Sequence, residues 1–301
     1  VRIQLEAATG NPSDMGLIGG SYGRGLDLPA VAGREGVGRI VEAGSEADAG
    51  LIGRRVQMPE PFGVWREEVV APANDLLFVP NDLPAEQAAL AFINPPTALR
   101  LLKDYIELQE GDWIIQNAAN SAVGFSVVAY AKRQGYRTIN LVRDLEKWEK
   151  PLKAAGADVV LSESDTDYPK KIKELTGGGK PRLGLNSIGG ESVSNIIKSM
   201  GENAEVVTFG GMVSDPVRFP TRFLIFSGLR LTGFWMDKWR KTNPPEAFQE
   251  LMDEVFALIA DRSIEVPIDQ KFAFDDALEA VERGFSGSRN GKVILTGPAA
   301  Q

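Results

Sequence analysis

The chain has 301 residues, 43% of them hydrophobic and 25% charged, which is typical of a soluble globular protein with room for two cores. With 33 Lys and Arg against 41 Asp and Glu, its formal net charge is −8, and it has no basic tail, which argues against nucleic acid and anionic membranes as partners. The absence of cysteine and histidine excludes disulfides, thiol nucleophiles, Ser-His-Asp triads and the usual zinc sites.

Membrane and secretory signals are missing from the sequence. No uninterrupted apolar run approaches the ~20 residues that a membrane helix needs, and the first residues lack a charged and apolar signal pattern. We therefore expect a soluble protein with no membrane partner. Because residues 1–8 alternate like a strand and no methionine precedes them, we also expect a trimmed N-terminus.

Residues 1–94 predict a small β-rich unit. A helix start follows the first strand, where Ser13 or Asp14 can cap the helix. A helix with an acidic first turn is expected over 85–91 and leads to a domain boundary near residue 94. The expected strands, separated by Gly and Pro, are 1–8, 33–44, 55–58, 63–70 and 76–80.

The rest of the chain predicts an alternation of strands and helices, and hence a doubly wound parallel sheet. Its six strands are expected near 113–118, 138–143, 157–162, 182–188, 204–210 and 229–235. An amphipathic helix over 245–262 and a strand, helix and strand over 268–296 complete the chain. The predicted domains are a substrate domain over 1–94 and 265–301 and a dinucleotide-binding domain over 95–264, with the cleft between them.

A dinucleotide site is predicted at residues 114–124. Ile114 and Ile115 are typical of a buried parallel strand, small residues form the turn, and a helix begins whose N-terminal amides can receive a pyrophosphate. Of the usual G-x-G-x-x-G pattern only Gly124 is in place, so a strand, turn and helix without a ligand is the alternative. Arg143 ends the next strand, about twenty residues on, where an acidic residue would select NAD. An arginine there favours the 2′-phosphate of NADP, and a surface arginine at a strand end is the alternative.

Residues 33–41, Gly-Arg-Glu-Gly-Val-Gly-Arg-Ile-Val, match the G-x-E-G-x-G-x-V pattern of the medium-chain dehydrogenase/reductase superfamily, which the chain resembles. Zinc-dependent members carry histidine at the place of Arg34, so the resemblance is to the zinc-free branch. Within that branch the chain resembles the trans-2-enoyl-CoA and enoyl-acyl-carrier-protein reductases of mitochondrial-type fatty acid synthesis, over nearly its whole length. The segments that carry this resemblance are 11–14, 21–23, 94–98, 115–124, 137–144, 209–212 and 233–235.

Three residues depart from the pattern of these reductases. Ala122 stands where glycine is usual, which we expect to narrow the pyrophosphate turn. Leu145 stands where a second arginine often follows, which we expect to weaken the grip on the 2′-phosphate. Arg34 stands where a smaller polar residue is common.

The resemblance implies an α/β fold, in which a GroES-like substrate domain is completed by both chain ends and a Rossmann domain binds NADPH. It implies a metal-free oxidoreductase that reduces the 2,3 double bond of trans-2-enoyl thioesters of CoA or acyl carrier protein, and that forms a homodimer. The implied location is the mitochondrial matrix in a eukaryote and the cytoplasm in a bacterium. The alternatives are a zinc-free NADPH:quinone or enone reductase and a nucleotide-binding protein without turnover.

The proposed chemistry needs one hydrogen-bond donor. Hydride addition to an enoyl thioester puts negative charge on the thioester oxygen, and a donor must face that oxygen. Because histidine is absent, a tyrosine hydroxyl is the best candidate, and the resemblance places it at Tyr22. The alternative is a surface tyrosine in a turn.

The cofactor contacts also follow from the resemblance, and no metal ligand is expected. The pyrophosphate would meet Asn120, Ser121, Ala122 and Val123, and Asn94 would lie near the nicotinamide end. Lys292 is either a cofactor contact or a solvent lysine at a strand edge. The other expected cofactor residues are Arg143, Asp144, Leu145, Phe209, Gly210, Gly211, Met212, Phe234, Trp235 and Met236.

Residues 234–241 combine aromatic side chains with three cations. Such a segment could line an acyl channel and meet the phosphates of CoA or an acidic carrier protein. The alternative is a half-buried helix start with a solvated basic face.

Overall fold

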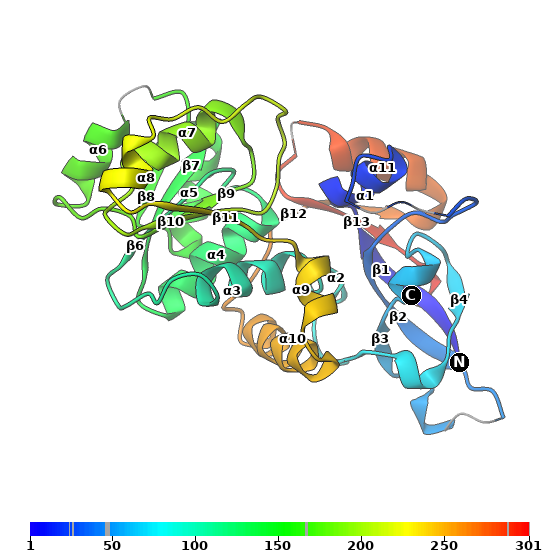
Figure 1. Ribbon diagram of the computed structural model, residues 1–301. Coiled ribbons are helices and arrows are strands. Elements are labelled where there is room, and N and C mark those ends of the chain that lie inside the picture. Colours follow the sequence, from blue (N-terminus) through cyan, green and yellow to red (C-terminus); the bar gives the residue numbers. More distant parts are fainter. Residues whose placement is uncertain (24, 26, 46–48, 166–167, 288, 301) are drawn as a thin grey trace. The chain divides into compact units, whose positions relative to one another are not determined.

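The computed structural model describes residues 1–23, 25, 27–45, 49–165, 168–287 and 289–300 (Figure 1). The chain forms two compact units, Val1–Asn94 with Glu246–Gln301, and Pro95–Pro245. The sequence predicts the second boundary after residue 264, whereas internal contacts assign helix α10 (Pro245–Ala260) mainly to the first unit. Phe256 of α10 packs edge-on against Phe92, with ring centroids 6.2 Å apart. Helical periodicity shows that a helix has an apolar stripe but not which core receives it.

The first unit is a β-sheet with helices. Its elements are β1 (Arg2–Thr9), α1 (Pro12–Ile18), β2 (Glu35–Glu42), β3 (Arg55–Gln57), β4 (Glu68–Val70), β5 (Phe78–Val79), α2 (Ala85–Ala89), α10, β12 (Ile268–Ala273), α11 (Ala277–Phe285) and β13 (Lys292–Thr296). The sheet runs in the order β12, β13, β1, β2, β3, β5, and β4 also pairs with β1. Figure 1 shows β1 and β13, from opposite ends of the chain, side by side, and they are antiparallel. Both chain ends therefore complete this sheet, as the sequence predicts.

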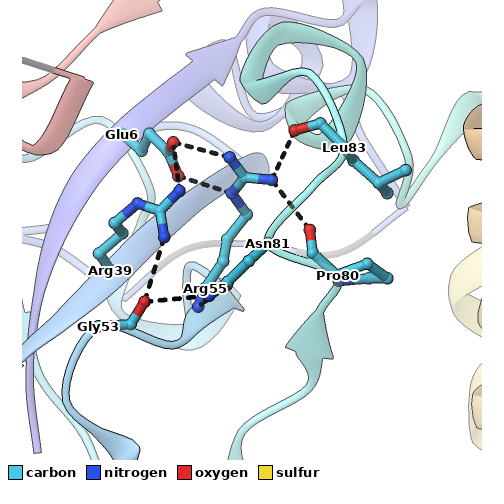
Figure 2. A network of polar contacts seen from close by, with 7 residues as sticks. All are labelled: Glu6, Arg39, Gly53, Arg55, Pro80, Asn81 and Leu83. Atoms are coloured by element: carbon cyan, nitrogen blue, oxygen red, sulfur yellow. Dashed lines mark hydrogen bonds and ion pairs between the residues drawn. The ribbon is translucent and has the colours of Figure 1, made fainter.

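The core of the first unit contains a buried charged cluster, centred on Glu6, among apolar side chains. Ile3 and Leu5 of β1 are fully buried, and Glu6, which follows Leu5 in the same strand, is 5% exposed. We call the cluster the Glu6 network, and Figure 2 shows its members, Glu6, Arg39, Gly53, Arg55, Pro80, Asn81 and Leu83. Nε and Nη2 of Arg55 donate to the two carboxylate oxygens of Glu6 at 2.7 and 2.8 Å. Nη1 of Arg55 donates to the carbonyls of Pro80 and Leu83 at 2.9 and 2.7 Å, so the network ties the sheet to the chain that follows it.

The strand expected over 63–70 is shorter in the structure, where only β4 is extended and paired. Gly63 has φ +76°, and a Cβ there would lie 2.1 Å from the carbonyl oxygen of Val31, so the chain turns sharply at a position only glycine fits. The N–H groups of Val64 and Trp65 then donate to the carbonyls of Gly33 and Ala32 rather than to a ladder. Residues 63–67 are therefore held by turn and loop hydrogen bonds, and sheet pairing begins only at Glu68.

The helix after β1 is capped two residues before Ser13 and three before Asp14, the two predicted caps. Helix α1 begins at Pro12, and Asn11 occupies the N-cap position with an extended backbone. Asp14 lies three residues later, and its Oδ2 accepts from the backbone N–H of Asn11 at 2.6 Å. Asp14 thus takes part in the cap as the third helical residue rather than as the cap itself.

The second unit has the doubly wound sheet that the alternation predicts. Its elements are α3 (Asn94–Lys103), β6 (Trp113–Gln116), α4 (Ala122–Arg133), β7 (Arg137–Val142), α5 (Leu145–Ala155), β8 (Val159–Ser162), α6 (Tyr168–Leu175), β9 (Leu183–Asn186), α7 (Gly190–Ser199), β10 (Glu205–Thr208), α8 (Arg222–Phe226), β11 (Arg230–Gly233) and α9 (Met236–Thr242). The six parallel strands run β11, β10, β9, β6, β7, β8. The strand order reverses between β6 and β9, and ligands bind at such a point, beyond the carboxyl ends of the strands.

Candidate functional site

Tyr22 lies in the first unit, at the end of a turn that follows α1. Its backbone N–H and that of Ser21 donate to the carbonyl of Gly16 at 3.0 and 2.8 Å, which folds the turn back onto the helix. The Tyr22 side chain is half-buried. Its hydroxyl oxygen accepts a hydrogen bond from Nη1 of Arg34 at 3.1 Å, so this turn tyrosine contacts a buried cation.

Arg34 immediately precedes β2 and is only 5% exposed. Its Nε donates to Oε1 of Glu60 at 2.9 Å, and its guanidinium carbon lies 5.1 Å from the centroid of the Tyr22 ring. In the sequence, Arg34 is notable only for standing where zinc-dependent dehydrogenases have histidine and where a smaller polar residue is common in the zinc-free reductases. A guanidinium has donors and no lone pair to offer a metal, so the residue type suits a hydrogen-bonding role.

A second buried polar cluster joins four separate segments of the first unit. We call it the Glu35 network, and its members are Gly10, Asn11, Asp14, Glu35, Asn94 and Lys292. The fully buried carboxylate of Glu35 accepts from the side-chain amides of Asn11 and Asn94 at 2.8 and 3.3 Å. It also accepts from the backbone N–H groups of Phe92 and Ile93 at 2.9 and 2.8 Å. Four hydrogen bonds therefore hold one buried carboxylate, as its desolvation requires.

The Glu35 network brings together two residues that the sequence predicts as cofactor contacts. Oδ1 of Asn11 accepts from Nδ2 of Asn94 at 3.0 Å and from Nζ of Lys292 at 2.5 Å. Lys292 also donates to the carbonyl of Gly10 at 2.8 Å. β13, which carries Lys292, lies between β12 and β1, so the alternative of a lysine at a strand edge is wrong.

Burial disfavours the charged forms of three groups in this network. It raises the pKa of Asp14, which is 1% exposed, to about 6, although the Asn11 N–H bond acts the other way. It raises the pKa of Glu35 and lowers that of Lys292 to about 8, although the charge of Glu35 favours the ammonium. Oδ1 of Asp14 is buried with no hydrogen-bond partner in the described part of the chain. The network thus contains three buried titratable groups whose charged forms are disfavoured, and one of them, Asp14, has an oxygen without a partner among the described residues.

The cofactor turn lies in the second unit, between β6 and α4. Ser121 caps α4, and its Oγ accepts from the N–H of Gly124 at 3.1 Å. A Cβ on Gly124 would lie 2.2 Å from the carbonyl oxygen of Ala119, so the helix approaches the turn at a distance only glycine allows. Among the described non-glycine residues, positive φ occurs at Ala118, Asn203 and Arg262 and not at Ala122. Alanine at 122 therefore fits its backbone without strain, and the unusual conformation belongs to Ala118 instead.

Buried amides support this turn where the strand order reverses. Nδ2 of Asn117, directly after β6, donates to Oδ1 of Asn186 at the end of β9 at 2.8 Å. Oδ1 of Asn117 accepts from the N–H of Ser187 at 2.8 Å. The N–H of Met212 in turn donates to the carbonyl of Ser187 at 3.2 Å, which brings the predicted segment 209–212 to the end of β9. Neither Asn117 nor Asn186 is among the predicted site residues, although amides at the ends of two buried strands are a signal that the sequence contains.

The predicted phosphate residues after β7 have different roles in the structure. Arg143 is exposed at the end of that strand. Asp144 caps α5, accepting from the N–H of Lys147 at 3.0 Å, and Leu145 packs against an apolar cluster beneath the helix. Burial raises the pKa of Glu163, beyond β8, and the charge of Arg143 opposes that shift. Of the three residues, Arg143 is the one whose side chain points to solvent with a charge suited to phosphate.

The segment after β11 has an aromatic interior and a basic surface. Phe234 stacks edge-on with Tyr105, with centroids 6.4 Å apart, and Met236 is buried. Lys238, Arg240 and Lys241 on α9 are exposed. Trp235, between Phe234 and Met236 in the sequence, is half-buried.

The described residues contain no group of three or more His, Cys, Asp or Glu side chains placed to hold a metal ion. In that same part of the chain, no helix is both long and apolar enough to cross a membrane.

Two family models match the chain. Residues 1–81 match the alcohol dehydrogenase GroES-like domain, and residues 122–257 match the model of the zinc-binding dehydrogenases. The second model is matched by a chain without histidine or cysteine, so the likeness extends to the fold but not to the metal ligands.

Curated and solved proteins are similar over nearly the whole chain. The human mitochondrial enoyl-acyl-carrier-protein reductase is 38% identical over 300 residues, which are 98% of this chain and 80% of that protein. The complex of Etr1p with NADP and crotonyl-CoA has a TM-score of 0.89 at 28% identity, covering 98% of this chain and 90% of that one. Etr1p of Candida tropicalis also occurs in a heterodimer with Etr2p, described as a mitochondrial 2-enoyl thioester reductase. A mycobacterial quinone oxidoreductase has a TM-score of 0.83 at 28% identity, covering 98% of this chain and 91% of that one.

Proposed function

The chain belongs to the family of the enoyl-acyl-carrier-protein reductases, and from that premise we propose that it reduces trans-2-enoyl thioesters with NADPH. In this reaction an enoyl thioester, NADPH and a proton give the saturated acyl thioester and NADP⁺. NADPH, when bound, supplies a hydride to C3 of the substrate. The residues of the chain must hold both molecules and stabilise the negative charge that moves onto the thioester oxygen.

The observation that carries the proposed chemistry is the position of the Tyr22 hydroxyl beside the guanidinium of Arg34. A chain without histidine or cysteine has few groups that can donate to a developing oxyanion. Tyr22 is assigned the role of hydrogen-bond donor to the thioester oxygen, and the proton that completes the reaction ends on C2. A fixed donor of this kind contributes roughly 2.7–4 kcal/mol to transition-state stabilisation.

The second unit is proposed to hold the cofactor. The capped N-terminus of α4 and the close approach at Gly124 suit a pyrophosphate, with Asn120, Ser121, Ala122 and Val123 as its contacts. The exposed guanidinium of Arg143 is proposed to bind the 2′-phosphate of NADPH. The other proposed contacts are Phe209, Gly210, Gly211, Met212, Phe234, Trp235 and Met236.

In the first unit, Asn94 and Lys292 are proposed to contact the cofactor from the Glu35 network. A lysine whose pKa is lowered to about 8 by burial gains from an anion near it. For Asp144 and Leu145, the cap and the apolar packing support structural roles more than cofactor contacts.

We also propose an oligomeric state, a partner chemistry and a location for the protein. β11 lies at the end of its sheet with all four residues exposed, and Phe226 of the preceding α8 is 81% exposed, which supports a homodimer through this edge. The cations of α9 suit the phosphates of CoA or an acidic carrier protein. We propose the mitochondrial matrix as the location in a eukaryotic cell and the cytoplasm in a bacterium.

The similarity to a quinone oxidoreductase makes quinone reduction the second candidate function. NADPH oxidation should be followed with crotonyl-CoA and, separately, with a simple quinone. We expect turnover with crotonyl-CoA at a kcat/KM at least tenfold above that for the quinone. A preference for the quinone would favour the second candidate. Tight NADPH binding without oxidation by either substrate would point to a nucleotide-binding protein without turnover.

A further inference from the structure

Arg34 is held at both ends of its guanidinium by groups of different kinds. Nε donates to the carboxylate of Glu60 at 2.9 Å, and Nη1 donates to the hydroxyl oxygen of Tyr22 at 3.1 Å. The Arg34 side chain is 5% exposed and that of Glu60 17%, so water screens this ion pair only weakly. Glu60 opens a short 3₁₀ turn, Glu60–Phe62, and Arg34 immediately precedes β2, so both ends of the pair start from defined backbone. The carboxylate thereby fixes the direction in which the guanidinium reaches Tyr22.

The chemistry of the two partners settles which of them donates. A guanidinium has five N–H donors and no acceptor, so the Tyr22 oxygen must accept in this bond. The phenol hydrogen takes no part in it. An acceptor bond on one side of a hydroxyl favours orientations in which its hydrogen points away from the donor. The bond therefore restricts the rotation of the Tyr22 O–H group.

We propose that Arg34 is a positioning residue for Tyr22, an inference that rests on the proposed function. When hydride adds to C3 of the enoyl thioester, the electron pair of the C2–C3 π bond moves toward the carbonyl, and charge develops on the thioester oxygen. Arg34 turns the hydroxyl hydrogen of Tyr22 to that oxygen and places a cation behind the donor, which strengthens the bond as the charge grows. Glu60 holds Arg34 in place. The proton gained by the substrate ends on C2, and neither Arg34 nor Glu60 changes its bonding to hydrogen.

A purely structural ion pair would give a different result when removed. Loss of the Arg34–Glu60 pair alone would lower stability and affect the rate equally whether or not Tyr22 is present. A positioning role makes the two residues act as one unit, so their effects on kcat are not additive. The double-mutant cycle of Arg34 and Tyr22 separates the two cases.

The cycle uses wild type, Arg34→Met, Tyr22→Phe and the double variant, each assayed with crotonyl-CoA and NADPH. Methionine keeps an unbranched stem but removes every donor. We expect Arg34→Met to lower kcat by about tenfold to a hundredfold, as for the loss of one charge-assisted bond that acts in the transition state. In the Tyr22→Phe background the same change should lower kcat less than about twofold. NADPH affinity, measured by fluorescence without substrate, should change less than about twofold throughout.

Two further variants keep the test decisive. Arg39→Met is the control, because Arg39 is a half-buried arginine of the same unit and pairs with Glu6. This variant should keep kcat within about twofold of wild type. Arg34→Lys keeps the charge but not the planar fork, so it should give an intermediate kcat even if Arg34→Met folds poorly. If Arg34→Met or Arg34→Lys lowers kcat by the same factor with and without the Tyr22 hydroxyl, the positioning role is wrong, while the proposed function stands. An unchanged kcat in both variants would also overturn the positioning role, and a wild type that does not reduce crotonyl-CoA would reject the proposed function together with it.

Discussion

The two buried polar networks of the first unit differ in how completely their charges are paired. In the Glu6 network, the carboxylate binds Arg55 through both oxygens, and the remaining Arg55 donor group binds two backbone carbonyls (Figure 2). In the Glu35 network, Asp14 has a buried oxygen without a partner among the described residues. Burial raises the pKa values of Asp14 and Glu35 and lowers that of Lys292, so it favours the neutral form of each group.

This difference separates a structural network from a functional candidate. Bonds from Arg55 to backbone carbonyls fix the path of the chain, which is what a stabilising network does. Perturbed titratable groups are common at functional sites, where charge is kept for a ligand at a cost in stability. Lys292 and Asn94, predicted as cofactor contacts, belong to the Glu35 network, and Arg34 precedes Glu35 directly in the chain.

Breaking the Glu6 network should have the largest effect on stability. Arg55→Met leaves the buried carboxylate of Glu6 and two carbonyls without their main donor, so the free energy of unfolding should fall by about 3–5 kcal/mol. Urea titration followed by circular dichroism measures this loss. Arg2→Met is the matched control, because Arg2 pairs with Glu42 and Glu68 at the surface and should contribute far less. Equal losses in the two variants would contradict the structural role of the Glu6 network.

Asp14→Asn should sharpen the comparison through pH. With a folded pKa of about 6 against an unfolded value of 3.8, folded Asp14 binds the proton more tightly, so its contribution to stability falls as pH rises from about 4 to 6. The shift corresponds to on the order of 3 kcal/mol over that window. The variant lacks this loss, so its stability relative to wild type should rise between pH 4 and 6 and level off above.

Urea titrations of both proteins at several pH values measure the Asp14 effect. Glu35, Lys292 and Arg34 are the charged groups that act on Asp14, and they are present in both proteins, so their own titration largely cancels in the difference. If the difference in unfolding free energy between the two proteins does not vary with pH, burial does not raise the pKa of Asp14.

The sequence predicts local features better than those that join distant segments. The alternation of strands and helices is repeated over short distances, and it predicts the six-stranded doubly wound sheet, whose strand order only the structure shows. The cofactor turn is similarly local, since Gly124 and Ser121 bond within a few residues. The Glu35 network is not local, because Asn11 and Lys292 are 281 residues apart. Such a cluster has no periodic pattern, and the resemblance alone pointed to Asn94 and Lys292.

Residues in the predicted motifs also have roles that their spacing does not reveal. Asp144 caps a helix and Leu145 packs in a core, because the chain turns directly from strand to helix after Arg143. Ala122, expected to narrow the turn, has an ordinary backbone, while Ala118 has φ +46°. Arg34 was a departure in the sequence, and only side-chain geometry connects it with Tyr22.

The most direct test of the central claim is the kcat of Tyr22→Phe with crotonyl-CoA and NADPH. Tyr22 as the donor predicts a fall of about a hundredfold to a thousandfold, with NADPH affinity nearly unchanged. Tyr136→Phe, the same change at a half-buried tyrosine of the second unit, should leave kcat unaffected. A Tyr22→Phe enzyme with kcat within about twofold of wild type would contradict the account.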